Sequence, residues 1–339
     1  MKLTIAIPTF NRAKRLGKAL VDLCNEINLA SNKAEVEVYV SNNGSLDETA
    51  EVVEKCRKLF IESGIPFYSG AFESNQGFDA NVLACYAANN SEYVWFLSDD
   101  DNIITGAVDS IIRDIDQYHP SVIFYNHDQK PYDMAHPYIK APEYFSKITD
   151  ENITALQKIA RWPKLTALVI RNCEAGKQVI NQESGYAHVA LALQCGIILG
   201  SVLHSSAFTA RPDADYKDHI DFVPYIGNSL DIVIRRALQK NNKMFLYKQL
   251  AIPYTDPLVA SLNSLGAYYR GRHVLTLPLK QELWRTVQRE MKSGWLKRLI
   301  DWYSVKELIK FPISLAYGVG CSLITNKKLT KDRQVPSDN

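Results

Sequence analysis

Short apolar stretches, rich in β-branched and aromatic residues, recur along the first part of the chain and predict β-strands. They are Leu3–Ile7, Val36–Val40, Pro66–Ser69, Tyr93–Leu97 and Val122–Tyr125. Between them, apolar residues recur every three or four positions, which predicts helices. These segments are Arg12–Ile27, Asp47–Glu62, Asp79–Asn89 and Thr105–Tyr118. Because strands and helices alternate, we predict an α/β fold with a mostly parallel sheet, right-handed crossovers and helices on both faces.

The same alternation continues less regularly in the second part of the chain. Leu165–Ile170 and Ile198–His204 predict strands, and Tyr186–Cys195 and Asn228–Gln239 predict helices. Ala210–Pro224 is polar and is predicted to be a loop. We find no internal repeat, so the second part is not a copy of the first.

Four of the predicted strands are followed by polar segments, which read PTFNR, SNNGS, SGAFESNQGF and SDDDN. In an open parallel sheet, ligands bind outside the carboxyl ends of the strands. We therefore expect the four segments to converge at one edge of the sheet and to form a binding site there.

The last of these segments places Asp99, Asp100 and Asp101 directly after an apolar strand. Carboxylates at the edge of a low-dielectric sheet repel one another, and a divalent cation removes that cost. In an extended backbone Asp99 and Asp101 project to one side, so we expect them to share Mg²⁺ or Mn²⁺. Asp100, on the other side, would contact a ribose or a backbone amide. The alternative is a solvated loop or a helix N-cap before Thr105–Tyr118.

The segments IAIPTFNR, VSNNGSLDET, SNQGFDANV and WFLSDDD resemble, in order and spacing, the motifs of family 2 glycosyltransferases of GT-A fold. Within that family the chain is most similar to bacterial enzymes that build O-antigen, capsule or related surface polysaccharide. The resemblance is specific over residues 1–125 and loose over 126–240. It implies a Rossmann-like GT-A catalytic domain at residues 1–250, with a nucleotide-sugar-binding half at 1–125 and an acceptor half at 126–250.

The resemblance implies that the first three polar segments bind the nucleotide sugar. The residues concerned are Pro8, Thr9, Arg12, Asn42, Asn43, Asn75, Gly77 and Asn81. Thr9 and Arg12 would hold the base and the phosphates, and Gly77 would let the backbone approach the nucleotide. Asn42 and Asn43 stand where the family usually has aspartates. Because an amide can still pair with a pyrimidine edge, a UDP-sugar is the first expectation for the donor, and the base stays open.

Mn²⁺ or Mg²⁺ is the expected cofactor, with Asp99 and Asp101 as its ligands. His204, at the end of a predicted strand, is the candidate for a third ligand. Asp99 and Asp100 are also expected to contact the nucleotide sugar. Arg211 is the candidate to neutralise the departing diphosphate.

An inverting transfer needs a base for the acceptor hydroxyl, and the family usually has an acidic residue at a helix start later in the chain. The corresponding stretch, ESGYAHVAL, offers Glu183 and His188. A histidine base suits neutral pH, although a lone histidine in an apolar helix also occurs as a packed core residue. Asp213, Asp215 and Asp218 remain open as the base or as acceptor contacts.

These residues lead us to expect a metal-dependent, inverting glycosyltransferase. It would move a sugar from a nucleotide-diphosphate sugar to a hydroxyl of a lipid-linked or oligosaccharide acceptor. Two alternatives remain open. A non-catalytic nucleotide-sugar-binding relative would suit Asn42 and the missing acidic base. A nucleotidyltransferase would need a glycine- and basic-rich loop after the first strand, and PTFNRAKR lacks the glycines.

Composition narrows the partners and the location. The net charge of +2 over 339 residues gives no basic field for nucleic acid. The six cysteines are scattered without a CxxC pair or zinc spacing, which favours reduced cytoplasmic thiols. The N-terminus lacks a signal-peptide core, and no apolar run reaches the ~18 residues of a spanning helix. We therefore expect a cytoplasmic protein.

The C-terminal region, residues 251–339, is predicted to be helical, basic and amphipathic. From Gln281 to Asn339, eleven Lys and Arg stand against six Asp and Glu. Apolar residues from Trp284 to Trp302 recur on one helical stripe, and an apolar stretch follows at Phe311–Thr325. We expect this region to contact anionic lipid at the inner face of the cell membrane. The alternatives are packing on the catalytic domain and an oligomer contact.

Overall fold

The computed structural model describes residues 1–126, 143–149, 156, 164–179, 185–212, 233–234, 236–239, 284–285 and 288. The chain divides into two compact units. The first comprises Met1–Lys217 and Ile232–Leu250, and the second comprises Asp218–Asp231 and Ala251–Asn339. Some of the predicted features lie outside the described residues: Glu183, Asp213, Asp215, Asp218 and, apart from residues 284–285 and 288, the region 251–339.

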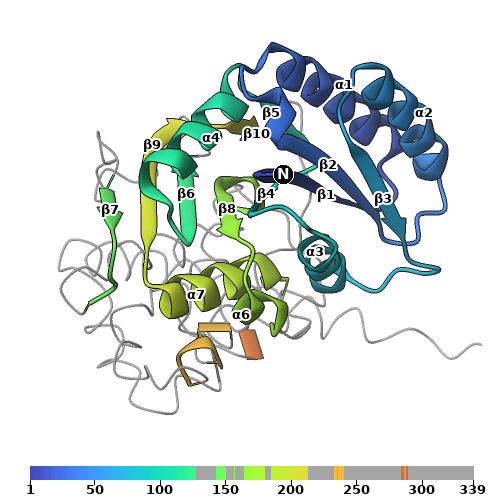
Figure 1. The fold of residues 1–339 in the computed structure, drawn as a ribbon. Helices are drawn as coiled ribbons and strands as arrows, with labels where there is room; N and C mark the ends of the chain where they lie inside the picture. Colours follow the sequence, from blue (N-terminus) through green and yellow to red (C-terminus); the bar gives the residue numbers. More distant parts are fainter. Residues whose placement is uncertain are drawn as a thin grey trace, which may run out of the picture. The chain divides into compact units, whose positions relative to one another are not determined.

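A large mixed sheet forms the centre of the first unit (Figure 1). Its strands are β1 (Leu3–Thr9), β2 (Val36–Asn42), β3 (Phe67–Ala71), β4 (Tyr93–Phe96), β6 (Val122–Asn126), β7 (Glu143–Phe145), β8 (Leu168–Arg171) and β9 (Val202–Phe208). Their order is β3-β2-β1-β4-β8-β6-β9-β7. The first four strands in this order are parallel, β8 runs antiparallel to both its neighbours, and β6 pairs parallel with β9. The predicted α/β fold is confirmed.

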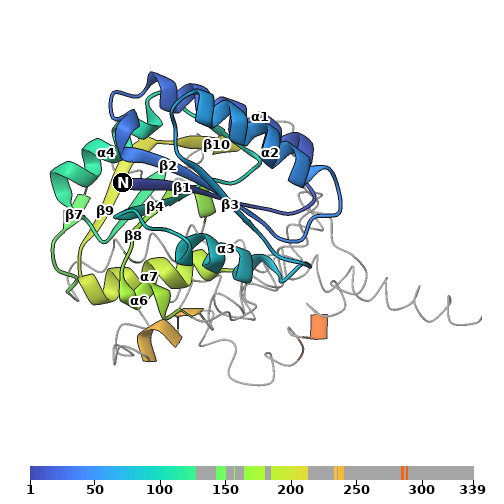
Figure 2. The same ribbon diagram turned by 45° about the vertical axis from the view of Figure 1, so that its right-hand side comes forward.

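Helices cover both faces of the sheet, as the alternation predicts (Figures 1 and 2). One face carries α1 (Ala13–Leu29), α2 (Thr49–Glu62) and α4 (Ala107–Tyr118), and the other carries α3 (Phe78–Ala87), α6 (Glu174–Lys177) and α7 (Ala187–Leu199). The helix α1 buries one apolar stripe against the sheet, whereas every residue of α7 from Ala187 to Gly196 is buried. None of the helices in the described part of the chain is both long enough and apolar enough to cross a membrane.

The predicted strand boundaries need three corrections. The strand β1 continues through Pro8 to Thr9; its pairing with β4 ends at Ala6, so a residue without an N–H is tolerated on this edge. The strand predicted at Ile198–His204 begins later, at Val202, because α7 runs on to Leu199 and ends at a left-handed glycine.

The third correction concerns the polar segment predicted to be a loop from Ala210. Its start forms β10 (Ala210–Pro212), which pairs antiparallel with β5 (Asp101–Ile103) in a separate two-stranded sheet. The register places Pro212 opposite Asp101 and Arg211 opposite Asn102. A segment from late in the chain therefore lies directly beside the aspartate triplet.

Candidate active site

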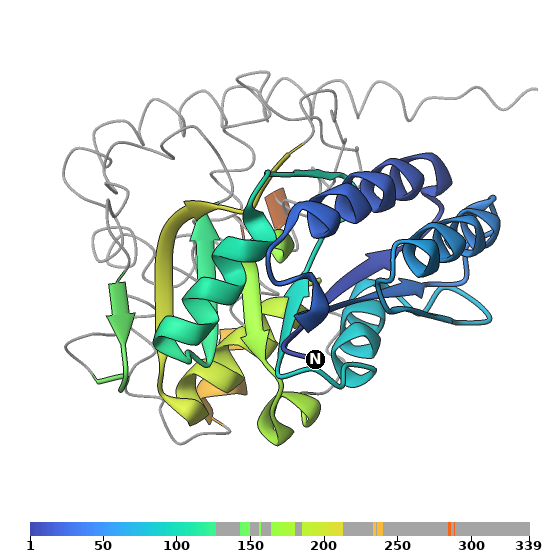
Figure 3. The ribbon, with the colours of Figure 1, turned by 45° about the horizontal axis from the view of Figure 1, so that its top comes forward.

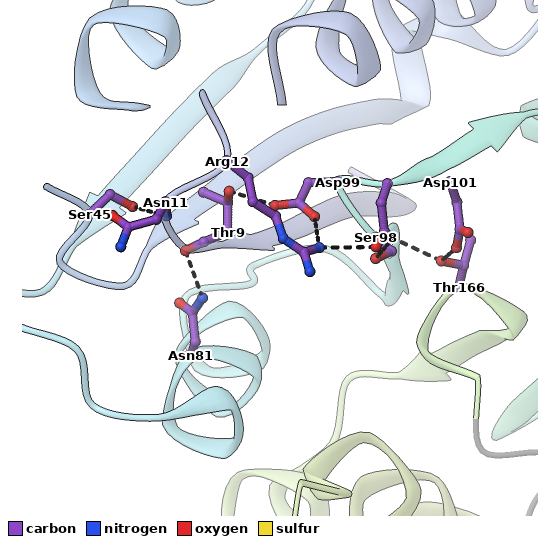
Figure 4. Close-up of polar contacts among 10 residues, drawn as sticks. Thr9, Asn11, Arg12, Ser45, Asn81, Ser98, Asp99, Asp101 and Thr166 are labelled. Atoms are coloured by element: carbon purple, nitrogen blue, oxygen red, sulfur yellow. Dashed lines mark hydrogen bonds and ion pairs between the residues drawn. The ribbon is translucent and has the colours of Figure 1, made fainter. Parts of the chain in front are cut away.

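The carboxyl ends of β1 and β4 meet in a cluster of charged side chains (Figure 4). The hydroxyl of Thr9 donates to Asp99 Oδ2 at 2.7 Å. Arg12 Nη1 lies 2.8 Å from Asp99 Oδ1 and 3.0 Å from Asp100 Oδ2. Asp100 also accepts from the hydroxyl of Ser98 at 2.5 Å. The first and fourth polar segments therefore converge as predicted, and one guanidinium holds two of the three aspartates.

Asp99 is the most buried of the three aspartates, with 4% of its surface exposed. Burial raises the pKa of Asp99 above its ordinary value, although the Arg12 charge and the hydrogen bonds from Thr9 and Arg12 favour the ionised form. Both carboxylate oxygens are already engaged by protein groups. The hydroxyl of Thr9, predicted to contact the nucleotide, is likewise committed to Asp99 in this structure.

Asp101 faces different neighbours. The Thr166 hydroxyl donates to Asp101 Oδ2 at 2.5 Å and accepts from the Ser98 backbone N–H at 3.0 Å. The Thr166 carbonyl in turn accepts from the Trp95 indole at 2.9 Å. Thr166 lies just before β8, beside β4 in the sheet, and no sequence motif marks it. Asp101 is therefore oriented by a strand that enters the sheet from the second part of the chain.

The second and third polar segments are joined through Asn43. Its amide donates to Asn75 Oδ1 at 2.9 Å and to the Gly77 carbonyl at 3.1 Å, and it accepts from the Gln76 backbone N–H at 2.9 Å. Gly77 has a φ of +86°, which favours glycine, and a Cβ atom added there would meet nothing within 4 Å. Asn43 is thus used within the protein, and the Gly77 backbone faces open space.

Two further amides shape the turns around this edge. Asn42 Oδ1 accepts from the Ser45 backbone N–H at 3.0 Å. Asn11 lies in the left-handed region, with a φ of +51°, where its side chain accepts from the Leu46 backbone N–H at 2.8 Å. Asn11 was not among the predicted site residues, although its residue type, in a polar segment after a strand, was an available signal.

Asn81 and Pro8 also lie at this edge. Asn81 Nδ2 donates to the Thr9 carbonyl at 3.3 Å. Pro8 pairs in register with Ser41 of β2, so it supports the segment from within the strand. Of the residues predicted to bind the nucleotide, all those from the first three polar segments are therefore brought together.

His204 is not brought to the aspartates. It pairs in register with Phe124 of β6, and β8 and β6 both lie between β4 and β9 (Figures 1 and 3). The His204 ring packs instead against the Phe124 ring, with centroids 5.3 Å apart. Within the described ranges, no group of three His, Cys, Asp or Glu side chains is arranged to hold a metal. His204 is separated from the aspartates because β8 and β6 lie between β4 and β9. Sequence periodicity predicted the strand at Leu165–Ile170 but not its position in the sheet.

His188 lies in the first turn of α7 and is 2% exposed. Its ring meets the Phe78 ring edge-on and also contacts the Tyr186 ring, each with centroids 5.9 Å apart. In the same place Asp79, to which the sequence assigned no role, accepts from the Ala187 backbone N–H at 3.1 Å. The start of α7 thus packs on the start of α3.

The residues present fit a hard divalent cation. Mg²⁺ and Mn²⁺ prefer carboxylate oxygens and share them with phosphates. Asp100 and Asp101 are both partly exposed, whereas Asp99 is buried and held at both oxygens by Thr9 and Arg12. The geometry therefore moves the expected ligand role from the pair Asp99 and Asp101 toward Asp101.

A mostly parallel sheet with polar loops at its carboxyl edge, and an aspartate triplet after a buried central strand, fits a domain of the GT-A class. Residues 4–173, half of the chain, match the model of the family described as glycosyl transferase family 2. The chain belongs to this family.

A curated relative is the GalNAc(5)-diNAcBac-PP-undecaprenol beta-1,3-glucosyltransferase of Campylobacter jejuni. The two are 30% identical over 112 residues, which is 33% of this chain and 34% of the relative. The match therefore spans about a third of that protein's length.

Two solved structures share the fold. Staphylococcus aureus TarS 1–349 in complex with UDP-GlcNAc has a TM-score of 0.52 at 16% identity, with 87% of this chain and 92% of that chain covered. The mannosyltransferase PcManGT of Pyrobaculum calidifontis, in complex with GDP-Man and Mn²⁺, has a TM-score of 0.54 at 14% identity, with 95% and 87% covered. At these identities the likeness concerns the fold alone.

Proposed function

We propose that this chain transfers a sugar from a nucleotide-diphosphate sugar to an acceptor hydroxyl. The observation that carries the proposal is the cluster of Thr9, Arg12, Asp99 and Asp100 at the joined ends of β1 and β4. Ligands of open α/β sheets bind outside the carboxyl ends of the strands, and the Arg12 guanidinium, whose side chain is 34% exposed, is the cation proposed to meet the diphosphate.

Each segment of the edge has a role in this proposal. The joined turns at Asn42–Ser45 and Asn75–Gly77 would line one side of the nucleobase and ribose, with the backbone at Gly77, where a Cβ would meet nothing within 4 Å, facing the nucleotide. Arg12, and Arg211 from β10, lie on the side of the diphosphate. Asp101, with Asp100 beside it, would hold Mg²⁺ or Mn²⁺, which neutralises the charge of the leaving diphosphate when bound. The Mn²⁺ complex of PcManGT supports the choice of metal.

The donor is proposed to be a UDP-sugar, which the TarS complex with UDP-GlcNAc supports. His188 is the proposed base, because it lies at the start of α7 beside the first turn of α3 and an imidazole accepts a proton near neutral pH. The acceptor hydroxyl would lose its proton to His188 as it attacks the sugar from the face opposite the diphosphate. This is an inverting transfer without a covalent intermediate, and Glu183 is the other candidate for the base.

The acceptor is proposed to be a lipid-linked glycan in bacterial surface glycan synthesis. The name of the Campylobacter jejuni relative describes an acceptor carried on PP-undecaprenol. A basic C-terminal region suits this substrate, because it would hold the protein at the anionic inner face of the membrane. Binding of the full chain to anionic vesicles tests this, with Lys297→Glu and Arg298→Glu as the matched variant. Equal binding by the wild type and this variant would remove the membrane proposal.

The proposed reaction is tested by incubating the full chain with a panel of nucleotide sugars, with and without Mn²⁺. Binding of the true donor should raise the unfolding temperature, since a ligand that binds only the folded state stabilises it. Release of the nucleoside diphosphate should require both the metal and an acceptor. Tight binding of a nucleotide sugar without any release would instead favour a non-catalytic relative, which Asn42 and Asn43 leave open.

A further inference from the structure

The first turn of α3 contacts the first turn of α7 through a buried carboxylate. Asp79 is 3% exposed, and its Oδ1 accepts from the backbone N–H of Ala187, the first residue of α7, at 3.1 Å. Next to it, the Phe78 ring meets the His188 ring edge-on, with an interplanar angle of 89°. Two consecutive residues of α3 therefore hold two consecutive residues of α7.

The same turn of α3 also makes hydrogen bonds to the carboxyl edge of the sheet, where the nucleotide is proposed to bind. The carbonyl of Gly77, which precedes α3, accepts from Asn43 Nδ2 at 3.1 Å. Asn81, at the end of the first turn of α3, donates to the Thr9 carbonyl at 3.3 Å. A single helical turn thus joins the segments after β1 and β2 to the start of α7.

Within α7 itself, no acidic side chain supports this end of the helix. Its N-cap residue, Tyr186, makes no side-chain cap hydrogen bond, and its first turn contains no acidic residue. The N-terminus of a helix exposes backbone N–H groups and carries a partial positive charge. A buried carboxylate at this end, supplied by α3, makes a charge-assisted hydrogen bond that is stronger than a neutral one. Asp79 therefore fixes the turn that carries His188.

We propose that Asp79 is a positioning residue, which holds His188 at a fixed place relative to the bound nucleotide sugar. The proposal rests on the proposed function and adds to it a residue of α3. Asp79 acts through α7 and not on the substrate, because its carboxylate is enclosed and engaged by the Ala187 backbone. Losing this contact should misplace the base while the nucleotide segments stay bonded to one another.

The test compares Asp79→Ala with Asp79→Asn in the full chain. The alanine variant removes the acceptor of the Ala187 bond, and the asparagine variant keeps an oxygen at the same position. We expect Asp79→Ala to lower kcat by about 10-fold or more, with the KM for the donor and the Kd for UDP changed by less than about 3-fold. Asp79→Asn should recover most of the lost kcat.

A matched control separates positioning from general destabilisation. Asp109 in α4 likewise accepts backbone N–H groups, from Ser31 and Asn32, with 3.0 Å to the Ser31 nitrogen. Asp109→Ala should therefore lower the unfolding temperature without changing kcat. The proposal is overturned if Asp79→Ala keeps the wild-type kcat, if it loses donor affinity as much as kcat, or if Asp79→Asn is as impaired as Asp79→Ala.

A second readout keeps this test independent of the proposed function. If the wild type turns over no nucleotide sugar, the proposed reaction fails, and amide hydrogen exchange then tests the contact itself. Faster exchange at Ala187 and His188 in Asp79→Ala, restored in Asp79→Asn, would support the role of Asp79 in fixing α7. Unchanged exchange in the alanine variant would contradict it.

Discussion

The proposed donor side and the proposed acceptor side of the first unit are built in different ways. On the donor side, in residues 1–126, polar side chains at strand ends bond to one another, as Thr9, Arg12 and Asp99 do. On the acceptor side, α7 is buried on all sides from Ala187 to Gly196, with His188 and Gln194 as its buried polar residues. The proposed donor side therefore carries its polar groups in segments that directly follow strands. On the proposed acceptor side, the polar groups lie within an otherwise apolar, buried helix.

Replacing Asp101 should have the largest effect, because Asp101 is the proposed ligand of the metal. Asp101→Ala is expected to lower kcat/KM by about 10²–10³-fold, the range seen when one group that stabilises developing charge is removed. Asp101→Asn keeps an acceptor for the Thr166 hydroxyl but removes the charge, so it should be almost as impaired. Steady-state kinetics across Mn²⁺ concentrations measure both. Wild-type activity in the asparagine variant would show that the Asp101 charge does not hold a metal.

Replacing Arg12 should distinguish a loss of donor binding from a loss of kcat. Arg12→Ala is expected to lower kcat/KM by about 10²-fold, mainly by weakening donor binding, whereas Asp79→Ala should act on kcat. Arg57, which donates to Ser69 and to the Phe67 carbonyl on the outer strand β3, provides the control, and Arg57→Ala should leave donor binding unchanged. Calorimetry with UDP measures this difference. Equal UDP affinity in the wild type and Arg12→Ala would contradict the assignment.

The donor loops were predictable because each follows a strand directly. Once strands and helices alternate, the loops after β1, β2, β3 and β4 meet at one edge, and Thr9, Arg12, Asn43 and Asp99 do so. The acceptor side was not predictable in this way. The insertion of β8 between β4 and β6 separates His204 from the aspartates and brings Thr166 to Asp101. Such pairings join residues far apart in sequence, and local periodicity does not predict them.

The pairing of β10 with β5 is a second long-range contact that local sequence patterns do not predict. Arg211 was predicted to meet the diphosphate from a loop, and the structure places it on a strand opposite Asn102. Asp79 received no role from its sequence context, and its contact with Ala187 spans 108 positions. The diphosphate role of Arg211 stays a prediction from residue type, and the location of both residues is set by tertiary structure.

A smaller effect, on the free energy of unfolding and on UDP binding, is expected from substitutions in the turns of the proposed donor side. Gly44 has a φ of +69°, and a Cβ there would lie 2.5 Å from the backbone carbon of Ser74. Gly44→Ala should cost more than the about 1–2 kcal/mol of the left-handed conformation alone, and it should weaken UDP binding. Gly64, with a φ of +70° and nothing within 4 Å, is the matched control, because Gly64→Ala incurs only the conformational cost. Equal losses in urea unfolding would contradict the close approach.

The smallest expected effect concerns only the thiol reactivity of Cys173 and Cys195, on the proposed acceptor side. The sulfur atoms of Cys173 and Cys195 lie 3.4 Å apart, and the hydrogen bond from Cys195 lowers the pKa of Cys173 to about 6. The Cys173 hydrogen bond and, after it, burial raise the pKa of Cys195. Because the thiolate is the reactive form, alkylation of Cys173 should rise with pH through about 6 and level off above it, while Cys195 stays unmodified. Mass spectrometry measures both sites.

Denatured protein provides the control for that pH profile. Unfolding removes the Cys195 hydrogen bond, so the pKa of Cys173 should return toward the ordinary thiol value of about 8.5. Cys195→Ala should have the same effect in the folded protein. A folded wild type whose Cys173 alkylation rises only near the ordinary thiol pKa would contradict the proposed pairing of the two thiols.

The central claim is that the joined ends of β1 and β4 bind a nucleotide-diphosphate sugar. A crystal structure of the full chain with Mn²⁺ and the donor found in the nucleotide-sugar panel tests it most directly. We expect a diphosphate in contact with Arg12, a metal ion held by Asp101, and the nucleobase against the joined turns at Asn43 and Gly77. A nucleotide bound elsewhere, with Arg12 still bonded only to Asp99 and Asp100, would contradict it.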